Sequence, residues 1–319
     1  MILTVTFNPL LEKRYFFDEI DLNSANKAKA LKLIAGGKGV NVSRQLNYLG
    51  ANNQAFLFLG GENGKILRRI LFSEKINFVS VNIKDNIGEG YVFIDKSKNQ
   101  KYVFFGLGFK VNDYEVIEFI DKLRKAIANS EIVVFSGSLP QENCQEILYE
   151  GLKACLEYDK ISILDTYGPF LNEVIKLKPT VLHNNIDEMK KSLNINLDNS
   201  DQIIDFLKSV YCLGIKRAFL TDGDKDFFCS NFDFIYKVAP KKIQELDSIG
   251  SGDSFTAGLA YGFYKDLTFE ETLKLACALG TLNAASYDAR EVKFDENNLR
   301  NFYPIITPIG KKINTLFDN

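Results

Sequence analysis

The stretch Asp247-Ser248-Ile249-Gly250-Ser251-Gly252-Asp253 stands directly before an apolar run at residues 255–261. The run is typical of a helix, so residues 250–253 are expected to form the turn that opens it. Glycine lets the backbone adopt conformations that other residues avoid, and it brings backbone N–H groups close to a ligand. Because unpaired N–H groups and the helix dipole both favour negative charge, this turn predicts an anion site.

Asp253, at the end of this stretch, has two interpretations. As a general base, it would accept a hydroxyl proton while the backbone amides stabilise a phosphoryl group in transfer. As a purely structural residue, it would only cap the helix in a glycine-rich turn. The segment alone supports these two interpretations equally.

A second glycine cluster, Gly36-Gly37-Lys38-Gly39-Val40-Asn41, also precedes an amphipathic helix. Its backbone amides, together with Lys38 and Asn41, suit a polyhydroxylated, phosphorylated ligand. The cluster lacks the Gly-x-x-x-x-Gly-Lys-Ser/Thr spacing of a P-loop. No Gly-x-Gly-x-x-Gly follows the first expected strand, which disfavours a Rossmann dehydrogenase.

Short apolar segments alternate with helical ones along most of the chain, which predicts a parallel sheet covered by helices. Strands are expected at residues 2–7, 54–59, 132–136, 161–165, 181–183 and 217–221. Helices are expected at residues 40–49, 64–73, 114–128, 141–157 and 200–210, and along most of residues 253–286. Two regions indicate hairpins instead, residues 16–21 with 30–34 and residues 90–95 with 101–105.

Composition excludes several classes of function. A formal net charge of −2 disfavours a nucleic-acid-binding surface, and no apolar run has the length of a membrane span. The five cysteines lack metal-ligand spacing and are expected to be buried free thiols. His183 is the only histidine, so a histidine-based triad or zinc site is disfavoured. The first residues indicate a buried strand rather than a signal peptide, and we expect a cytoplasmic protein.

Five segments, in order along nearly the whole chain, resemble those of the PfkB group of ribokinase-like carbohydrate kinases. The group carries Gly-Gly-Lys-Gly-x-Asn near its start and Thr-x-Gly-Ala-Gly-Asp near its end, and residues 36–41 and 248–253 fill these places. Residues 4–9 resemble the opening strand of the phosphosugar branch of this group. Residues 134–140 resemble its Ser-Gly-Ser-Leu-Pro strand end, and residues 185–188 resemble its Asn-x-x-Glu segment.

The resemblance implies a ribokinase-like α/β fold, in which a three-layer α/β/α core with a mostly parallel sheet carries a small β-sheet lid. It implies one kinase domain over residues 1–319, with lid segments at about 10–36 and 86–110. The two hairpins would form this lid and could pair between the subunits of a homodimer. An antiparallel extension of the main sheet is the alternative.

The implied activity is the ATP-dependent phosphorylation of a sugar phosphate. Fructose 1-phosphate, converted to fructose 1,6-bisphosphate by a 1-phosphofructokinase activity, is the first expectation for the acceptor. Tagatose 6-phosphate, another sugar and a nucleoside are alternatives. A catalytically weak protein that binds sugar phosphates is an alternative of another class.

The resemblance also implies roles for individual residues. Asp253 would be the catalytic base, with the N–H groups of Gly250, Ser251 and Gly252 on the transferring phosphoryl group. The residues expected to bind the acceptor are Glu12, Lys27, Gly37, Lys38, Asn41 and Tyr91. The residues expected to bind ATP are Asn185, Thr221, Gly223, Gly252 and Asn283. Asn185 and Glu188 would also act on Mg²⁺, in part through water.

Three of these assignments have structural alternatives. Asn185 and Glu188 have the spacing of a capping box at a helix start. Asn283 could equally lie on a helix surface, and Lys27 could be a solvated cation.

Four positions depart from the pattern of the phosphosugar branch. Glu12 replaces an aspartate, and Gly90-Tyr91 replaces Thr-Arg. His183-Asn184-Asn185 replaces Lys-Pro-Asn, and Gln141 stands where a basic residue often follows. Arginine is suited to bidentate recognition of phosphate. The losses therefore predict weaker substrate binding, an altered substrate or reduced activity.

Overall fold

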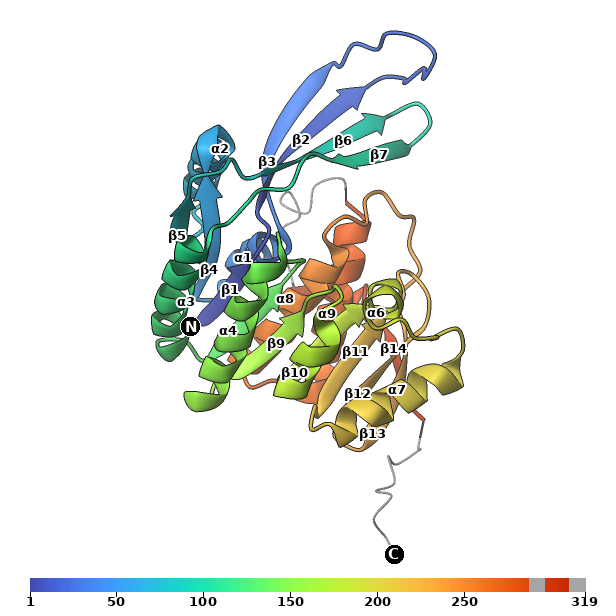
Figure 1. Cartoon of the computed structure of the whole chain (residues 1–319). Coiled ribbons are helices and arrows are strands. Elements are labelled where there is room, and N and C mark those ends of the chain that lie inside the picture. The colour runs from blue at the N-terminus through green and yellow to red at the C-terminus, as the bar shows by residue number, and fades with distance from the viewer. Residues whose placement is uncertain (287–295, 310–319) are drawn as a thin grey trace, which may run out of the picture.

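The computed structural model describes residues 1–286 and 296–309, which form two sheets and the helices around them (Figure 1). The larger sheet has the order β14-β13-β12-β11-β10-β9-β8-β1-β4-β5. Its seven strands from β5 to β11 run parallel, and β12, β13 and β14 add an antiparallel edge. The bounds are β1 (Ile2–Thr6), β4 (Asn53–Gly60), β5 (Phe78–Ile83), β8 (Ile132–Ser136), β9 (Ile161–Asp165), β10 (Val181–Asn185), β11 (Arg217–Thr221), β12 (Phe227–Asn231), β13 (Phe234–Ala239) and β14 (Ile305–Pro308).

Helices cover both faces of this sheet, because successive side chains of each strand point to opposite sides. Ile2 on β1 packs with one group of helices (α1, α8 and α9), and Leu3 packs into the core beneath the other (α3, α4 and α7). The helices are α1 (Lys38–Tyr48), α2 (Gly61–Ser73), α3 (Asp113–Ala128), η1 (Glu142–Cys144), α4 (Gln145–Glu157), α5 (Leu171–Val174), η2 (Ile175–Leu177), α6 (Ile186–Leu193), α7 (Ser200–Cys212), α8 (Ser251–Tyr264), α9 (Phe269–Ala284) and α10 (Glu296–Arg300). Within the described residues, no helix is long and apolar enough to cross a membrane.

The strands and helices predicted for the parallel part of the sheet are confirmed, with ends within three residues of those observed except at α4, which begins at Gln145 after η1 rather than at residue 141. The edge strand β5 was not predicted. The β12–β13 hairpin was not predicted. Its turn places Phe232 at φ 54°, a left-handed conformation for which turn residues such as glycine and asparagine are the usual signal. Because Phe232 occupies that position, the sequence contains no glycine or asparagine signal at this point of the turn.

The smaller sheet is the lid, formed by β2 (Leu10–Phe17), β3 (Ala30–Gly36), β6 (Gly88–Asp95) and β7 (Gln100–Phe105). All four strands lie within the predicted lid segments, and Figure 1 shows them as a separate layer at the top of the molecule. The alternative of an edge extension is therefore wrong. The hairpin predicted at residues 16–21 is also misplaced, because β2 ends at Phe17.

The two hairpins form one sheet because β2 pairs in parallel with β6 along its whole length, from Leu10 opposite Gly88 to Phe17 opposite Asp95. The chain leaves β1 and enters β2 after only three residues. This short connection places the base of the lid above the carboxyl end of the main sheet.

Close packing of α8 on α9 positions the glycine-rich turn predicted at residues 250–253. A Cβ atom added to Gly258 would lie 2.5 Å from the Cα atom of Ala276. Any side chain at this position would therefore force the two helices apart.

We predict that Gly258→Ala lowers the free energy of unfolding by about 1–3 kcal/mol, as over-packing typically does. Urea or thermal denaturation measures the change. Gly108→Ala is the matched control, because a Cβ atom there meets nothing within 4 Å. Equal stability of the two variants would contradict this account of the helix pair.

Candidate active site

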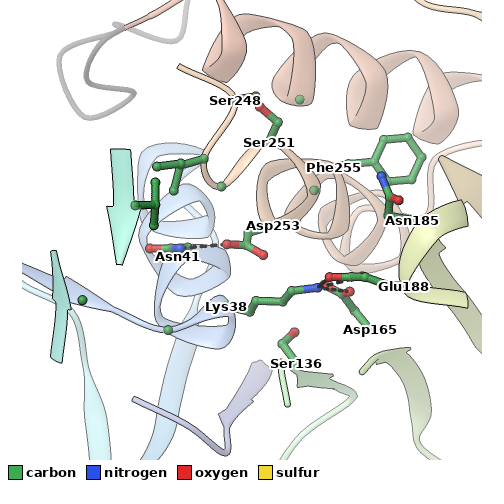
Figure 2. A pocket seen from close by; sticks show the side chains of 18 of the residues that line it. Lys38, Asn41, Ser136, Asp165, Asn185, Glu188, Ser248, Ser251, Asp253 and Phe255 are labelled. Atoms are coloured by element: carbon green, nitrogen blue, oxygen red, sulfur yellow. Dashed lines mark hydrogen bonds and ion pairs between the residues drawn. The ribbon is translucent and has the colours of Figure 1, made fainter. Parts of the chain in front are cut away.

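A cavity of about 890 Å³ lies between the lid and the carboxyl ends of the parallel strands. Its floor includes the last residue of each of five strands: Thr6, Ser136, Asp165, Asn185 and Thr221. Ligands of open α/β sheets bind at this edge because the loops that follow the strands converge there. Figure 2 shows the side chains that gather in the cavity.

The turn before α8 supplies the centre of the cavity. Gly250 has φ 82°, a left-handed conformation that favours glycine, and α8 begins at the next residue. Gly250 occupies the cap position, so the interpretation of Asp253 as the helix cap is wrong. Asp253 lies one turn further, buried, with its carboxylate in the cavity (Figure 2).

A chain of hydrogen bonds holds the Asp253 carboxylate in place. Asn41 Nδ2 donates to Asp253 Oδ2 at 2.7 Å, and Arg44 Nη1 donates to Asn41 Oδ1 at 2.7 Å. Arg44 is itself buried and paired with Glu74 at 2.8 Å. Burial raises the pKa of Asp253 above its usual range, although Lys38 and the Asn41 bond act in the opposite direction.

Asn283 lies behind the glycine-rich turn. Its Nδ2 donates to the Ile249 carbonyl oxygen at 2.9 Å and to Ser251 Oγ at 3.1 Å, and its Oδ1 accepts from Ser254 at 3.3 Å. The side chain is buried, so the alternative of a helix-surface residue is wrong. Asn283 is also absent from the described cavity lining, whereas its neighbours Thr281 and Ala284 belong to it.

Lys38 reaches across the cavity floor from the start of α1. Its Nζ lies 3.2 Å from Asp165 Oδ1 and 3.0 Å from Glu188 Oε1 (Figure 2). Burial by itself would lower the pKa of Lys38, but the carboxylates of Asp165, Glu188 and Asp253 raise it well above its usual range. Lys38 is therefore a permanent cation.

Asp165 received no role from the sequence, although it ends a predicted strand. Burial raises the pKa of its carboxyl group to about 7, even though Lys38 is close enough to favour the charged form. Its other oxygen, Oδ2, accepts a hydrogen bond from Thr256 at 3.1 Å. Its place at the end of a predicted strand indicates its position at this crevice, but gives it no catalytic or binding role.

Two further hydroxyl groups were also missed. Thr6 and Ser136 face each other in register at the ends of β1 and β8, and both line the cavity. Their side-chain oxygens are buried without a hydrogen-bond partner among the described residues. Buried hydroxyl groups are normally paired, so these two are suited to polar groups of a ligand.

His183 stands where the phosphosugar branch has the lysine of Lys-Pro-Asn. Its Nδ1 lies 2.8 Å from Thr256 Oγ1, and its Nε2 lies 3.3 Å from Thr221 Oγ1. Burial lowers the pKa of His183 to about 3, so the ring is neutral. Because Thr256 donates to Asp165, the His183 Nδ1–H donates to Thr256.

Asn185 caps α6, accepting a hydrogen bond from the Asp187 N–H at 2.8 Å. Glu188 faces Lys38 and does not complete a capping box, so only half of that structural alternative is confirmed. Thr221, the last residue of β11, and Gly223, two residues later, both line the cavity.

The predicted acceptor residues divide into two groups. Glu12, Gly37, Lys38, Asn41 and Tyr91 line the cavity. Tyr91 belongs to this lining through its place on β6, but its side chain is on the same face of the lid as Phe104, its partner on β7. On that face its hydroxyl donates to Glu89, and Lys13 lies over its ring. Lys27 lies in the exposed β2–β3 loop, outside the described lining.

Comparison with known proteins identifies the family of this chain. A family model described as pfkB family carbohydrate kinase matches residues 10–295. The chain belongs to this family. The tagatose-6-phosphate kinase of Staphylococcus epidermidis is 31% identical over 302 residues, which cover 93% of this chain and 97% of that protein. This chain is also 30% identical to the 1-phosphofructokinase of Borreliella burgdorferi over 285 residues, which cover 89% of this chain and 92% of that protein.

The solved structures show the same fold. Phosphofructokinase-2 from Escherichia coli superposes on the kinase with a TM-score of 0.86 at 22% identity, over 95% of this chain and 97% of that one. The ribokinase-like fold predicted from the sequence is thereby confirmed. As a member of a family of carbohydrate kinases, the protein uses ATP as a substrate.

The raised pKa of Asp165 predicts a pH-dependent stability. Its carboxyl group titrates near 3.8 when unfolded and near 7 when folded, so folding stability is lost as the pH rises between these values. Asp165→Asn removes this loss, and we expect its unfolding free energy, relative to the wild type, to rise between about pH 4 and pH 7.

Urea denaturation across this pH range measures the difference. Ser136→Ala is the matched control, because Ser136 is equally buried beside Asp165 but carries no charge. A difference between Asp165→Asn and wild type that stays constant with pH would show that the folded carboxyl group titrates normally.

Proposed function

We propose that this kinase transfers the γ-phosphoryl group of ATP to a hydroxyl of a sugar phosphate, with fructose 1-phosphate as the first acceptor to test. One observation carries the proposal. A buried carboxylate, Asp253, lies one turn into a helix whose glycine-rich start opens into the same cavity. The names of the two relatives support a sugar phosphate as the acceptor.

In this proposal Asp253 accepts the proton of the attacking hydroxyl. Its pKa, raised by burial, brings the carboxylate closer to the pH at which a general base works best. Asn41 holds one of its oxygens at 2.7 Å and thereby directs the other toward the acceptor.

The glycine-rich turn stabilises the phosphoryl group in transfer. The Ser251 N–H donates to the Ser248 carbonyl oxygen at 3.1 Å, so we assign this role chiefly to the N–H groups of Gly250 and Gly252. Removing one such donor costs about 3–4 kcal/mol of barrier in other enzymes. Asn283 supports the turn from behind and does not touch ATP in this proposal.

Magnesium suits the oxygen donors of the site only through bound water, because no group of three or more carboxylate, histidine or cysteine side chains in the described part of the chain is arranged to hold a metal ion directly. Asp165, Glu188 and Asp253 surround Lys38, so the cluster carries an excess of negative charge. Mg²⁺ prefers such oxygen donors and keeps several of its waters. Since Asn185 caps α6 and Glu188 contacts Lys38, we expect both to hold Mg²⁺ through bound water. The ion would supply charge neutralisation for the phosphates of ATP.

A coupled assay with ATP and magnesium tests the proposal on fructose 1-phosphate, tagatose 6-phosphate, fructose 6-phosphate and free sugars. Asp253→Asn should lower kcat at least about a hundredfold, in line with general-base contributions, while ATP affinity changes little. A near-normal rate would remove Asp253 from this role. Binding of sugar phosphates without turnover of any acceptor would favour the weakly catalytic binding protein instead.

We also propose that two kinase chains pair through the outer face of the lid. That face carries apolar side chains from all four strands, among them Tyr15, Leu31, Leu33, Phe93, Tyr102 and Phe104. Leu31 is 51% exposed and Phe104 56% exposed, while Tyr15 and Phe93 stack at 5.5 Å. A contiguous exposed apolar patch is typical of an interaction site, and a homodimer buries the same patch on both copies.

Phe104→Glu should convert the dimer to a monomer, because a charge in an apolar interface is costly to desolvate. Size-exclusion chromatography with light scattering gives the mass. Ile117→Glu is the matched control, since Ile117 is equally exposed, at 56%, but lies on α3. A wild-type protein that is monomeric at assay concentrations would contradict the proposed dimer.

The kinase is further proposed to be one domain over residues 1–319 that works in the cytoplasm. All five cysteines are free thiols, and four of them are buried, as is common in proteins of reducing compartments.

A further inference from the structure

Asp247 connects the lid to the main body of the kinase. Arg14 Nη1, on β2, lies 2.7 Å from Asp247 Oδ2, and Lys101 Nζ, on β7, lies 2.7 Å from Asp247 Oδ1. The Asp247 side chain is only 8% exposed. Both cations belong to the lid, whereas Asp247 belongs to the loop that leads into α8.

The same carboxylate also shapes the glycine-rich turn. Asp247 Oδ1 accepts a hydrogen bond from the Ile249 N–H at 3.0 Å, and the Ile249 carbonyl oxygen accepts from Asn283. Gly250 follows directly. A movement of Asp247 would therefore shift the start of the turn that carries the proposed phosphoryl contacts.

Arg14 extends the connection to the acceptor side of the cavity. Its Nε donates to Glu12, and the Glu12 side chain lines the cavity from the inner face of the lid. The side chains of Arg14 and Glu12 are 11% and 14% exposed. A continuous series of charged contacts thus runs from Glu12 through Arg14 and Asp247 to the turn at Gly250.

The charges in this series balance, with two cations against two carboxylates. Loss of one partner from a mostly buried group of charges leaves the others without compensation. The lid also contains ion pairs of a different kind, such as Lys29 with Asp18, which are exposed and stay within the lid. The contacts of Asp247 differ because they join two separate sheets and their loops.

We propose that Asp247 is a positioning residue that couples the lid to the glycine-rich turn, so that nucleotide bound at the turn orders the lid and strengthens acceptor binding. The identity of the acceptor rests on the proposed function, but the link between nucleotide and lid does not. Coupling of this kind is reciprocal: the acceptor must strengthen nucleotide binding by the same factor.

Hydrogen exchange of the full chain tests the link without any acceptor. A non-hydrolysable ATP analogue with magnesium should slow amide exchange in β2 and β7 about 5-fold or more in the wild type. Asp247→Asn should abolish this protection, and Asp247→Glu should restore part of it. Lys29→Met is the matched control, since it removes a lid cation that does not touch Asp247, and it should behave as the wild type.

Acceptor binding gives the second measurement. The affinity for fructose 1-phosphate should rise about 5-fold or more when the ATP analogue is present, and this gain should vanish in Asp247→Asn. In the steady state, the acceptor KM of that variant should rise more than its kcat falls. If Asp247 had a purely structural role, Asp247→Asn would lower the stability of the kinase but leave the nucleotide-dependent gain in acceptor affinity unchanged.

The proposal is overturned if nucleotide still protects the lid in a folded Asp247→Asn variant, or if Lys29→Met loses the protection as well. If Asp247→Asn does not fold, Lys101→Met is measured instead, because it removes a contact of Asp247 by a change within the lid. Loss of the nucleotide-dependent protection in this variant supports the proposal, and full protection overturns it. A wild type whose lid is protected by nucleotide but which phosphorylates no sugar phosphate would contradict the proposed function and leave the coupling standing.

Discussion

Three carboxylates, Asp165, Glu188 and Asp253, lie around the ammonium group of Lys38 at the floor of the cavity. Two like charges about 4 Å apart repel by about 4 kcal/mol where the effective dielectric constant is about 20. Without a cation between them, these side chains could not share one cavity while charged. At the end of β9 and the starts of α6, α8 and α1, the ammonium group of Lys38 offsets this repulsion. Asp253, the carboxylate proposed as the base, and the glycine-rich turn before it lie beside this group of charges.

The positions that lost a basic residue are filled by neutral groups with partners inside the protein. Gln141 accepts a hydrogen bond from the Val111 N–H and donates one to the Val111 carbonyl oxygen. His183 is a neutral ring between two threonines, and the Tyr91 hydroxyl donates to Glu89. In the proposed function, negative charge on the substrates would therefore meet backbone N–H groups and Lys38 rather than a set of arginines. The lid cations Arg14 and Lys101 are already engaged with Asp247.

Much of the fold could be read from local patterns. Strands such as residues 132–136 and 161–165 are short apolar runs, and their bounds agree with the structure because a buried parallel strand needs no alternation. The glycine clusters marked both helix starts, at α1 and α8. Local patterns failed where a residue's role depends on distant partners. Asn283 matched an asparagine expected near the nucleotide, yet it bonds to the turn from behind.

The sequence by itself indicated the kind of chemistry, because a carboxylate beside two glycines at a helix start suits a base next to an anion site, and the five ordered motifs resemble those of carbohydrate kinases. It also determined the parallel sheet, through apolar runs that alternate with helical ones. Only the tertiary structure decided which charges meet. The contacts between Asp247 and Arg14, and between Lys38 and Asp165, join residues more than a hundred positions apart. Such pairs depend on how the lid and the strand ends pack, which no local pattern records.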